Sequence, residues 1–391
     1  MSQGKLNVLH IHLSDTGSWP MEIDMYPEFT KDASYRNETY TRQEIRDLVQ
    51  FAKERGVKIL PEIDMPGHSP AHFDAPEITA QYGPIVQCTT VEYNTPEYCF
   101  EPPAGQWNIS NPNVTTILLN VLTQLSEDFS TAPHLHIGAD EVNTNCSAVG
   151  TAYEHSTYDE KKNFTKYSVQ AFLENILTNI TDNLGMKVAM WQDSIAVYDV
   201  EIDEPEDVLI QIWSYHDAQG PVLKKYCQEG SQMIQSATRY YYLDCGDENP
   251  FLSPPNFCTT FESWKTIYLQ DIITASPGMP EECDNSFTGA SVQLWSEKIN
   301  KNTMMAKLFP RALALAERLW SNPTIPASND GEEWIPAQMR LRLVNDFNLM
   351  NKCLEVAPMQ PEFCLKNPAI CDEFALTHGP RSNLHSVSSL E

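Results

Sequence analysis

The segment His134-Leu-His-Ile-Gly-Ala-Asp-Glu-Val142 sets the expectation for the fold. Residues 134–137 predict a short β-strand, which delivers Asp140 and Glu141 through Gly138. The missing side chain of Gly138 leaves room for a ligand to approach the backbone. Strands that end in polar or aromatic residues are typical of α/β barrels, in which the active site is assembled at the carboxyl ends of the strands.

The same pattern recurs on both sides of this segment. Further strands are predicted over residues 6–13, 57–63, 187–191, 208–213, 233–236 and 291–295. Helices are predicted between Thr41, which forms a capping box with Glu44, and Gly56, and over 114–129, 167–184 and 303–320. The alternation predicts an α/β fold of the (β/α)8 TIM-barrel class, with a parallel sheet covered by helices. The seven predicted strands are one fewer than a closed barrel of this class needs.

The length and net charge of the chain indicate which classes of protein function are compatible with the sequence. The 391 residues suit one large catalytic domain, predicted over 1–376, followed by a loose Ser-rich tail over 377–391. Lys and Arg total 26 against 53 Asp and Glu, a net charge of −27. Such an acidic surface repels phosphate backbones and anionic lipids, which argues against nucleic-acid and membrane-surface roles. The sequence also holds no apolar stretch long enough for a membrane helix.

Cysteines and glycosylation sequons point to the secretory pathway. The ten cysteines form no CxxC zinc pattern and are predicted to be mostly disulfide-bonded, within irregular loops over 70–113 and 242–288. Met1 to Lys5 do not resemble a signal peptide, so we expect the full-length protein to carry one upstream. Six Asn-X-Ser/Thr sequons support the same compartment, and they begin at Asn37, Asn108, Asn113, Asn145, Asn163 and Asn179.

The adjacent carboxylates Asp140 and Glu141 are the first candidates for chemistry. Neighbouring side chains diverge from one backbone site, so they are poorly placed to flank a sugar ring from opposite faces, as ordinary glycosidases require. One carboxyl can instead protonate a leaving group while its neighbour orients a second group, such as one belonging to the substrate. An Asp-Glu pair alone is more often a solvated loop feature. Three Trp at strand ends are compatible with the walls of a sugar pocket and equally with core packing: Trp191, Trp213 and Trp295.

Several motifs, taken together and in order, resemble the β-N-acetylhexosaminidases of glycoside hydrolase family 20, over Lys5 to about Cys371. The resemblance is closest to the secreted fungal branch. It implies a secreted or vacuolar/lysosomal protein that needs no cofactor or metal. The motifs are Lys5-Leu-Asn-Val-Leu-His-Ile-His-Leu-Ser-Asp15, Glu62-Ile-Asp-Met-Pro-Gly-His68, His136-Ile-Gly-Ala-Asp-Glu-Val142, Tyr242-Leu-Asp-Cys245, Leu294-Trp-Ser-Glu297 and Ala316-Glu-Arg-Leu-Trp320.

The resemblance implies exo-acting hydrolysis of terminal N-acetyl-β-D-hexosamines, with the acetamide of the substrate as nucleophile. Glu141 is then the general acid and later the base. Asp140 holds the acetamide N–H and offsets positive charge on the ring, and Tyr242 donates to the acetamide oxygen. The implied substrates are amino-sugar glycans such as chitin oligosaccharides and glycoconjugates, and a homodimer is the implied assembly.

The remaining implied roles concern binding and support. Glu297 is expected to bind outer hydroxyls of the terminal sugar. A box around the methyl group and sugar ring is expected from Trp191, Trp213 and Trp295. A supporting network behind Glu141 is expected from Asp15, His68 and His136. Loop proximity and the resemblance together suggest three disulfides: Cys364–Cys371, Cys99–Cys146 and Cys245–Cys258.

Two departures and two rival functions accompany this resemblance. Ile11 and Ser147 stand where family members usually carry Trp, and the family's first barrel strand, with its sugar-binding Arg, and small preceding α/β domain are expected upstream of Met1. A non-catalytic sugar-binding homologue is therefore one alternative. The other is a metal-dependent hydrolase, because His10-X-His12 places two imidazoles on one side of a strand.

Overall fold

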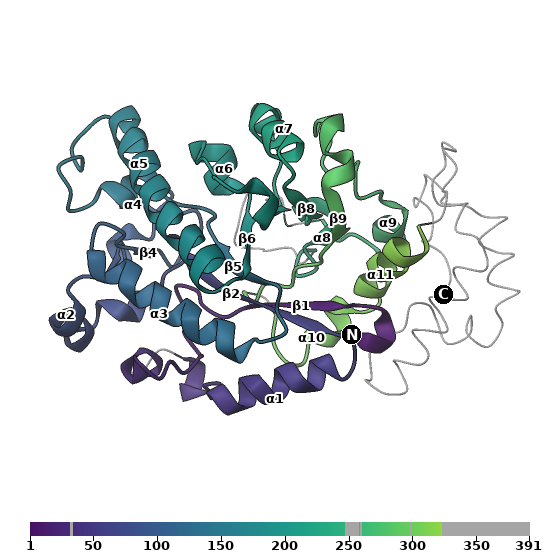
Figure 1. Cartoon of the computed structure of the whole chain (residues 1–391), viewed down its shortest axis with the longest axis horizontal. Coiled ribbons are helices and arrows are strands. Elements are labelled where there is room, and N and C mark those ends of the chain that lie inside the picture. The colour runs from purple at the N-terminus through teal and green to yellow at the C-terminus, as the bar shows by residue number, and fades with distance from the viewer. Residues whose placement is uncertain (32–33, 247–257, 259, 298, 323–391) are drawn as a thin grey trace, which may run out of the picture. The chain divides into compact units, whose positions relative to one another are not determined.

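The computed structural model describes residues 1–31, 34–246, 258, 260–297 and 299–322 (Figure 1). The chain divides into two compact units. The larger unit comprises Asn7–Gln235 and Ser276–Thr288, and the smaller unit comprises Met1–Leu6, Ser236–Ala275 and the described part of Gly289–Glu391. The predicted tail and the predicted Cys364–Cys371 pair lie outside the described residues.

A seven-stranded sheet follows the order of the chain. The strand order is β1-β2-β5-β6-β7-β8-β9. Within this sheet, the neighbouring strands β1, β2, β5, β6, β7 and β8 all pair in parallel, as expected when helical segments connect successive strands. This arrangement confirms the predicted α/β class with barrel-type topology. The strands are β1 (Val8–His12), β2 (Lys58–Met65), β5 (His134–Gly138), β6 (Lys187–Trp191), β7 (Val208–Ile212), β8 (Gln232–Gln235) and β9 (Phe287–Ala290).

Helices connect the strands, and local sequence signals set their ends. The helix α1 begins after Thr41, whose side chain forms the predicted capping box with Glu44. It ends at Lys53, three residues before Gly56. The larger unit also contains a short antiparallel pair, β3 (Val86–Gln87) with β4 (Gln106–Trp107). Its helices are α1 (Arg42–Lys53), α2 (Pro76–Tyr82), α3 (Pro112–Asp128), α4 (Thr144–Ala148), α5 (Tyr158–Thr178), α6 (Asp193–Tyr198) and α7 (Gly220–Gln228).

The smaller unit is mainly helical. It contains α8 (Thr238–Tyr241), α9 (Trp264–Leu269), α10 (Met304–Leu308) and α11 (Arg311–Ser321). The helices α9 and α11 pack together, and Arg318 of α11 lies 2.8 Å from Asp271. Its buried apolar side chains include Tyr241, Leu243, Ile267, Tyr268, Leu313 and Leu315. Each fully buried side chain of this size stabilises the fold by about 1.5–3 kcal/mol.

Three predicted elements differ from the structure. The strand expected over 291–295 lies earlier, as β9, and Gln293 makes only an isolated bridge to Tyr242. The helix expected over 303–320 is divided at Pro310, which has no N–H to continue the helical hydrogen bonds. The helix expected over 167–184 begins at Tyr158, because Thr157 forms a capping box with Glu160. Across the described residues, no helix combines the length and apolar character required to cross a membrane.

Candidate active site

Asp140 and Glu141 leave the end of β5 on a constrained backbone. Gly138, Ala139 and Glu141 have φ values of +65°, +69° and +47°. Left-handed conformations are costly for residues with a side chain, and they cluster at functional sites. A Cβ at Gly138 would lie 1.9 Å from Oδ1 of Asp64, so only glycine fits there. The backbone thus presents the two carboxylates in one fixed arrangement.

Of the predicted supporting residues, His68 lies beside Glu141, and Asp15 lies beside His68. Nε2 of His68 is 3.3 Å from Oε2 of Glu141, and its Nδ1 is 3.8 Å from Oδ1 of Asp15. His68 also has a positive φ, +47°, three residues beyond the end of β2. Burial would lower its pKa, but Glu141, Asp140 and Asp15 outweigh burial and raise the pKa of His68 to about 10. The imidazole is therefore a cation that faces Glu141.

Asp140 shares its surroundings with two further acids, Asp64 and Asp193. Burial, together with the nearby Glu141, raises the pKa of Asp140 to about 6, although His68 opposes the shift. Burial and the Asp140 charge raise the pKa of Asp64 well above its usual range. Burial, Asp140 and Glu141 raise the pKa of Asp193 to about 8. With a pKa of about 6, Asp140 is ionised at neutral pH, whereas Asp193, with a pKa of about 8, carries a proton.

Glu62 of β2 is a fully buried carboxylate that the sequence-based site did not include. Its Oε2 lies 2.7 Å from Nε2 of His10 and 3.1 Å from Nδ1 of His12, and its Oε1 lies 3.1 Å from Nδ1 of His136. The indole N–H of Trp191 donates to Oε1 at 3.0 Å. Burial would raise the pKa of Glu62, but the three histidines lower it well below its usual range. His136, which was predicted to support Glu141, thus has Glu62 as its carboxylate partner.

The geometry of these groups could hold a metal ion in principle. Ligand atoms of His10, Glu62 and His136 lie within 4.8 Å of one another, and so do those of Asp64, His68 and Asp140. Imidazole and carboxylate ligands suit zinc and other transition metals. Their mutual contacts already provide a charge partner for Glu62, so the cluster is also explained without an ion.

Two of the predicted sugar-binding tryptophans belong to the larger unit. Trp191 is only 1% exposed, and its ring centroid lies 5.3 Å from that of His136. Trp213 follows β7 and donates its indole N–H to Oδ2 of Asp193 at 2.7 Å. Both rings are therefore oriented by buried or partly buried carboxylates. Their contact with a sugar stays a prediction.

The other predicted binding residues belong to the smaller unit. The rings of Tyr242 and Trp295 lie 6.1 Å apart at 50°, and the backbone N–H of Trp295 donates to Oδ1 of Asp244 at 3.2 Å. Tyr242 pairs with Gln293 through a parallel bridge. Glu297 is exposed. Because these residues and the carboxylates belong to different units, their convergence on one substrate stays a prediction.

A pocket that is open to solvent adjoins Glu141 within the larger unit. Glu141 and His68 form part of its lining, and residues of the β3–β4 loop form much of the rest. Phe100 in this loop is 64% exposed. The lining residues are Thr16, His68, Tyr98, Cys99, Phe100, Glu101, Pro103, Gly105, Gln106, Glu141 and Asn143.

Comparisons with known proteins agree with this geometry. Residues 1–323 match the family described as glycosyl hydrolase family 20, catalytic domain. The chain belongs to glycosyl hydrolase family 20. It is 30% identical to a β-hexosaminidase 1 of Coccidioides posadasii, and the match covers 95% of this chain and 64% of that protein. It is 26% identical to a chitooligosaccharidolytic β-N-acetylglucosaminidase of Bombyx mori, with 95% and 60% covered.

Solved structures of family 20 proteins share the fold. A β-N-acetylhexosaminidase from Bacteroides fragilis superposes with a TM-score of 0.66 at 22% identity, covering 91% of this chain and 66% of that one. A chitobiase from Flavobacterium johnsoniae gives a TM-score of 0.64 at 24% identity, covering 90% and 48%. The chain thus spans slightly less than two thirds of the length of the curated relatives compared above.

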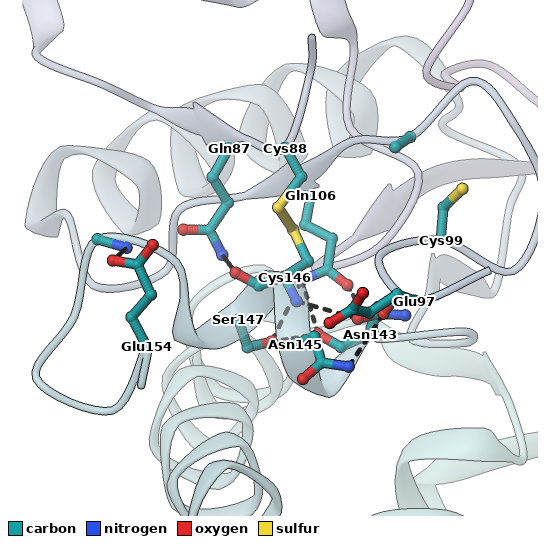
Figure 2. Close-up of a disulfide and its surroundings, with 12 residues drawn as sticks. Gln87, Cys88, Glu97, Cys99, Gln106, Asn143, Asn145, Cys146, Ser147 and Glu154 are labelled. Atoms are coloured by element: carbon teal, nitrogen blue, oxygen red, sulfur yellow. Dashed lines mark hydrogen bonds between the residues drawn. A yellow bond between two sulfur atoms is a disulfide. The ribbon is translucent and has the colours of Figure 1, made fainter. Parts of the chain in front are cut away.

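In this family 20 chain, a disulfide and two glutamines hold the segment that follows Glu141 (Figure 2). Cys88, next to β3, pairs with Cys146 of α4, with their Cα atoms 6.0 Å apart. Gln87 donates to the carbonyl oxygen of Cys146 at 3.1 Å, and Gln106 of β4 accepts from the backbone N–H of Asn143. The β3–β4 pair therefore anchors the start of α4, three residues beyond Glu141.

The disulfides correct one predicted pairing and confirm another. Cys146 pairs with Cys88 instead of Cys99, because the β3–β4 pair places Cys88 against α4. Cys99 lies apart from this disulfide in Figure 2 and is buried without a disulfide among the described residues. Cys245–Cys258 is confirmed. Cys227–Cys283 is an additional disulfide that the sequence left open.

Proposed function

We propose that this chain is the catalytic part of an exo-acting β-N-acetylhexosaminidase. Its substrates are terminal non-reducing N-acetyl-β-D-hexosamines of chitin oligosaccharides and glycoconjugates. The observation that carries the proposal is the placement of Asp140 and Glu141 on one constrained turn, with the His68 imidazole against Glu141. Adjacent carboxylates suit a reaction in which the substrate supplies its own nucleophile.

Glu141 acts first as the acid and then as the base. It protonates the glycosidic oxygen while the 2-acetamide oxygen of the substrate attacks C1 from the other face, so that the leaving group departs and an oxazolinium ion forms. Glu141 then removes a proton from the water that opens this ion, and the anomeric configuration is retained. The cationic His68 stays near Glu141 and stabilises its carboxylate once the proton has left.

Asp140 stabilises the positive charge that develops during the attack. Its pKa of about 6 leaves Asp140 ionised at neutral pH, so that a negative charge faces the developing cation. Asp140 accepts the acetamide N–H and so orients the carbonyl oxygen toward C1. Tyr242 donates to that oxygen in the same proposal.

The remaining binding roles follow the family pattern. Glu297 binds outer hydroxyls of the terminal sugar, and the aromatic box is formed by Trp191, Trp213 and Trp295. This proposal treats residues 1–376 as one catalytic domain, in a secreted or vacuolar/lysosomal protein that forms a homodimer. Disulfides at Cys88–Cys146, Cys227–Cys283 and Cys245–Cys258 support an oxidising compartment.

The test is hydrolysis of an aryl N-acetyl-β-glucosaminide by the chain and by its Glu141→Gln variant. We expect Glu141→Gln to lower kcat by about 10²- to 10⁴-fold, the usual contribution of a general acid. The matched control is Glu174→Gln, which changes an exposed glutamate on α5 and leaves the rate unchanged.

Other outcomes separate the rival functions. Binding of an N-acetylglucosamine thiazoline-type analogue without any hydrolysis would replace the proposal with a sugar-binding role. Hydrolysis that a chelator abolishes and zinc restores would replace it with metal-dependent chemistry. Hydrolysis that survives in Glu141→Gln would reject Glu141 as the acid.

A further inference from the structure

A line of imidazole and carboxylate groups runs from Glu141 into the core of the larger unit. Glu141 contacts His68, and His68 faces Oδ1 of Asp15 at 3.8 Å. Oδ2 of Asp15 is hydrogen-bonded to Nε2 of His12 at 3.1 Å, and Nδ1 of His12 lies 3.1 Å from Oε2 of Glu62. The sequence resemblance explains only the outer part of this line, up to Asp15.

The register of the sheet places the inner part of the line. His12 of β1 is paired with Glu62 of β2, and Glu62 is paired with His136 of β5. Side chains at paired positions of neighbouring parallel strands point to the same face. Glu62 and His136 are both fully buried, whereas the side chain of His12 is 20% exposed. His12 is therefore the link between a buried anchor and the more exposed Asp15.

Asp15 depends on this link for its orientation. Its side chain is 46% exposed and follows β1, so nothing in its burial alone fixes its carboxylate. The backbone N–H of Thr16 donates to Oδ1 at 2.5 Å, and His12 contacts Oδ2. With Oδ2 held by His12, Oδ1 faces His68. Loss of the His12 contact leaves Oδ2 without this bond, so that the N–H of Thr16 on Oδ1 is the hydrogen bond that still orients the carboxylate.

We propose that His12 is a positioning residue for the acid–base step: it couples the buried Glu62 to Asp15 and so holds His68 against Glu141. This inference rests on the proposed hexosaminidase function. The charged groups that face His12 are Glu62 and Asp64 of β2 and Asp15 beyond β1. Burial would lower the pKa of His12, but Glu62 and Asp15 outweigh burial and raise it well above its usual value.

His10 provides a matched control on the same strand. It lies two residues before His12 on β1, and its side chain is 18% exposed against 20% for His12. It approaches the same Oε2 of Glu62, at 2.7 Å. Only His12 also reaches Asp15. A substitution of His10 therefore removes a contact of Glu62 but leaves the contacts from His12 through Asp15 and His68 to Glu141 in place.

The amide substitutions of His12 separate its two contacts. Asn places its amide donor near the position of the imidazole Nδ1 and can still face Glu62, but it is too short to reach Asp15. Gln places its donor near the position of Nε2 and can still face Asp15. We expect His12→Asn to impair the acid–base step and His12→Gln to restore much of it. His10→Asn is the control for loss of an imidazole beside Glu62.

The experiment compares leaving groups, because only poor leaving groups need a proton from Glu141. With an alkyl N-acetyl-β-glucosaminide, we expect His12→Asn to lower kcat about tenfold, with little change in KM. With the 2,4-dinitrophenyl glycoside, we expect a rate close to that of the unmodified chain. His10→Asn should leave the ratio of the two rates unchanged. An equal loss on both substrates, or an equal loss in His10→Asn, would overturn the proposal.

A second measurement does not depend on turnover. The titration of His68, followed by NMR of its imidazole, responds oppositely to the two roles of His12. Removal of a neighbouring cation alone would raise the pKa of His68, whereas release of Asp15 removes an anionic partner and lowers it. We expect a lower pKa of His68 in His12→Asn and no change in His10→Asn. A raised or unchanged pKa in His12→Asn would overturn the proposal.

The kinetic and NMR measurements distinguish failure of the proposed hexosaminidase function from failure of the proposed role of His12. Absence of hydrolysis by the unmodified chain counts against the proposed function, and the His68 titration then still decides the role of His12. Where His12→Asn does not fold, Asp15→Asn breaks the same line from its exposed side. It should give the same loss, confined to the alkyl glycoside, and an equal loss on both glycosides would reject the coupling.

Discussion

The end of β5 and the Tyr242–Trp295 pair are held in different ways. At the end of β5, Gly138, Ala139 and Glu141 adopt positive φ values. The side chain of Glu141 there contacts the imidazole of His68. In the smaller unit, an aromatic contact, a single bridge and one backbone hydrogen bond hold Tyr242 and Trp295. The first region constrains both backbone and charge, whereas the second constrains mainly the position of flat rings.

This difference suggests a division between chemistry and recognition. A group that donates a proton or offsets developing charge must be placed within a fraction of an ångström, which justifies the cost of a strained backbone. Stacking on a sugar ring tolerates more variation, because dispersion and solvent exclusion depend weakly on small shifts. Substitutions in the first region should therefore lower kcat, and those in the second should mainly raise KM.

The largest expected effect tests this division directly. We expect Asp140→Asn to lower kcat about 10²- to 10³-fold, because the amide keeps the shape of the side chain but loses the charge to which we assign stabilisation of the transition state. We expect Glu297→Gln to raise KM about tenfold with a smaller change in kcat, since it weakens hydrogen bonds to bound hydroxyls. Steady-state kinetics with one aryl glycoside provides both values. A similar kcat loss in both variants would remove the distinction between the two regions.

The next effect concerns the backbone that presents the carboxylates. Gly138 and Gly150 both have positive φ, +65° and +73°, but only at Gly138 does a Cβ meet other atoms. We expect Gly138→Ala to destabilise folding by about 3 kcal/mol or more, through strain combined with a clash against Asp64. Gly150→Ala has only the conformational cost, about 1 kcal/mol. Urea unfolding of the two variants measures the difference, and equal losses would mean that the close approach to Asp64 is unimportant.

The pH dependence of stability tests the charge at His68. Its pKa of about 10 in the folded chain lies above the ordinary value of 6.5, so the stability it contributes is fully present below pH 6.5 and is lost as the pH rises through 10. The difference in unfolding free energy between the unmodified chain and His68→Gln should therefore shrink between pH 6.5 and 10.

His134, at the start of β5, is a control because its pKa is shifted in the opposite direction to that of His68. Burial, with Lys187 and Lys58 nearby, lowers its pKa to about 4. Its effect on stability therefore changes only between pH 4 and 6.5, where the unfolded chain binds more protons than the folded chain. His134→Gln should leave the pH dependence above 6.5 unchanged. If it flattens that range as His68→Gln does, the assignment of the alkaline change to His68 is wrong.

The sequence predicted the parts of the fold that depend on local signals. The Thr41 capping box and the six strands from β1 to β8 were recognisable, because capping residues and β-forming runs act over a few neighbouring positions. The strand expected at 291–295 was misplaced by four residues, since the structure has β9 at Phe287–Ala290. Pro310 is the residue that should have divided the last predicted helix.

Features that depend on contacts between distant segments were not predictable in the same way. The choice of Cys88 over Cys99 as the partner of Cys146 depends on the β3–β4 pair, whose strands are only two residues long. Glu62 carried a visible signal, a polar residue in a strand, but its role depends on the register that aligns it with His12 and His136. Adjacent residues such as Asp140 and Glu141 are placed together by the chain itself, so their proximity could be predicted from the sequence.

The smallest expected effect concerns the contact between Trp213 and Asp193. The indole N–H that donates to Asp193 at 2.7 Å lowers the pKa of this carboxyl, which burial and Asp140 raise to about 8. Trp213→Phe keeps an aromatic ring but removes the donor, so we expect the pKa of Asp193 to rise further and stability to fall by about 1 kcal/mol. Carboxyl NMR of the two chains measures the shift, with Trp320→Phe, at an exposed tryptophan, as the control. An unchanged titration of Asp193 would mean that ring packing alone orients Trp213, as it does the Tyr242–Trp295 pair.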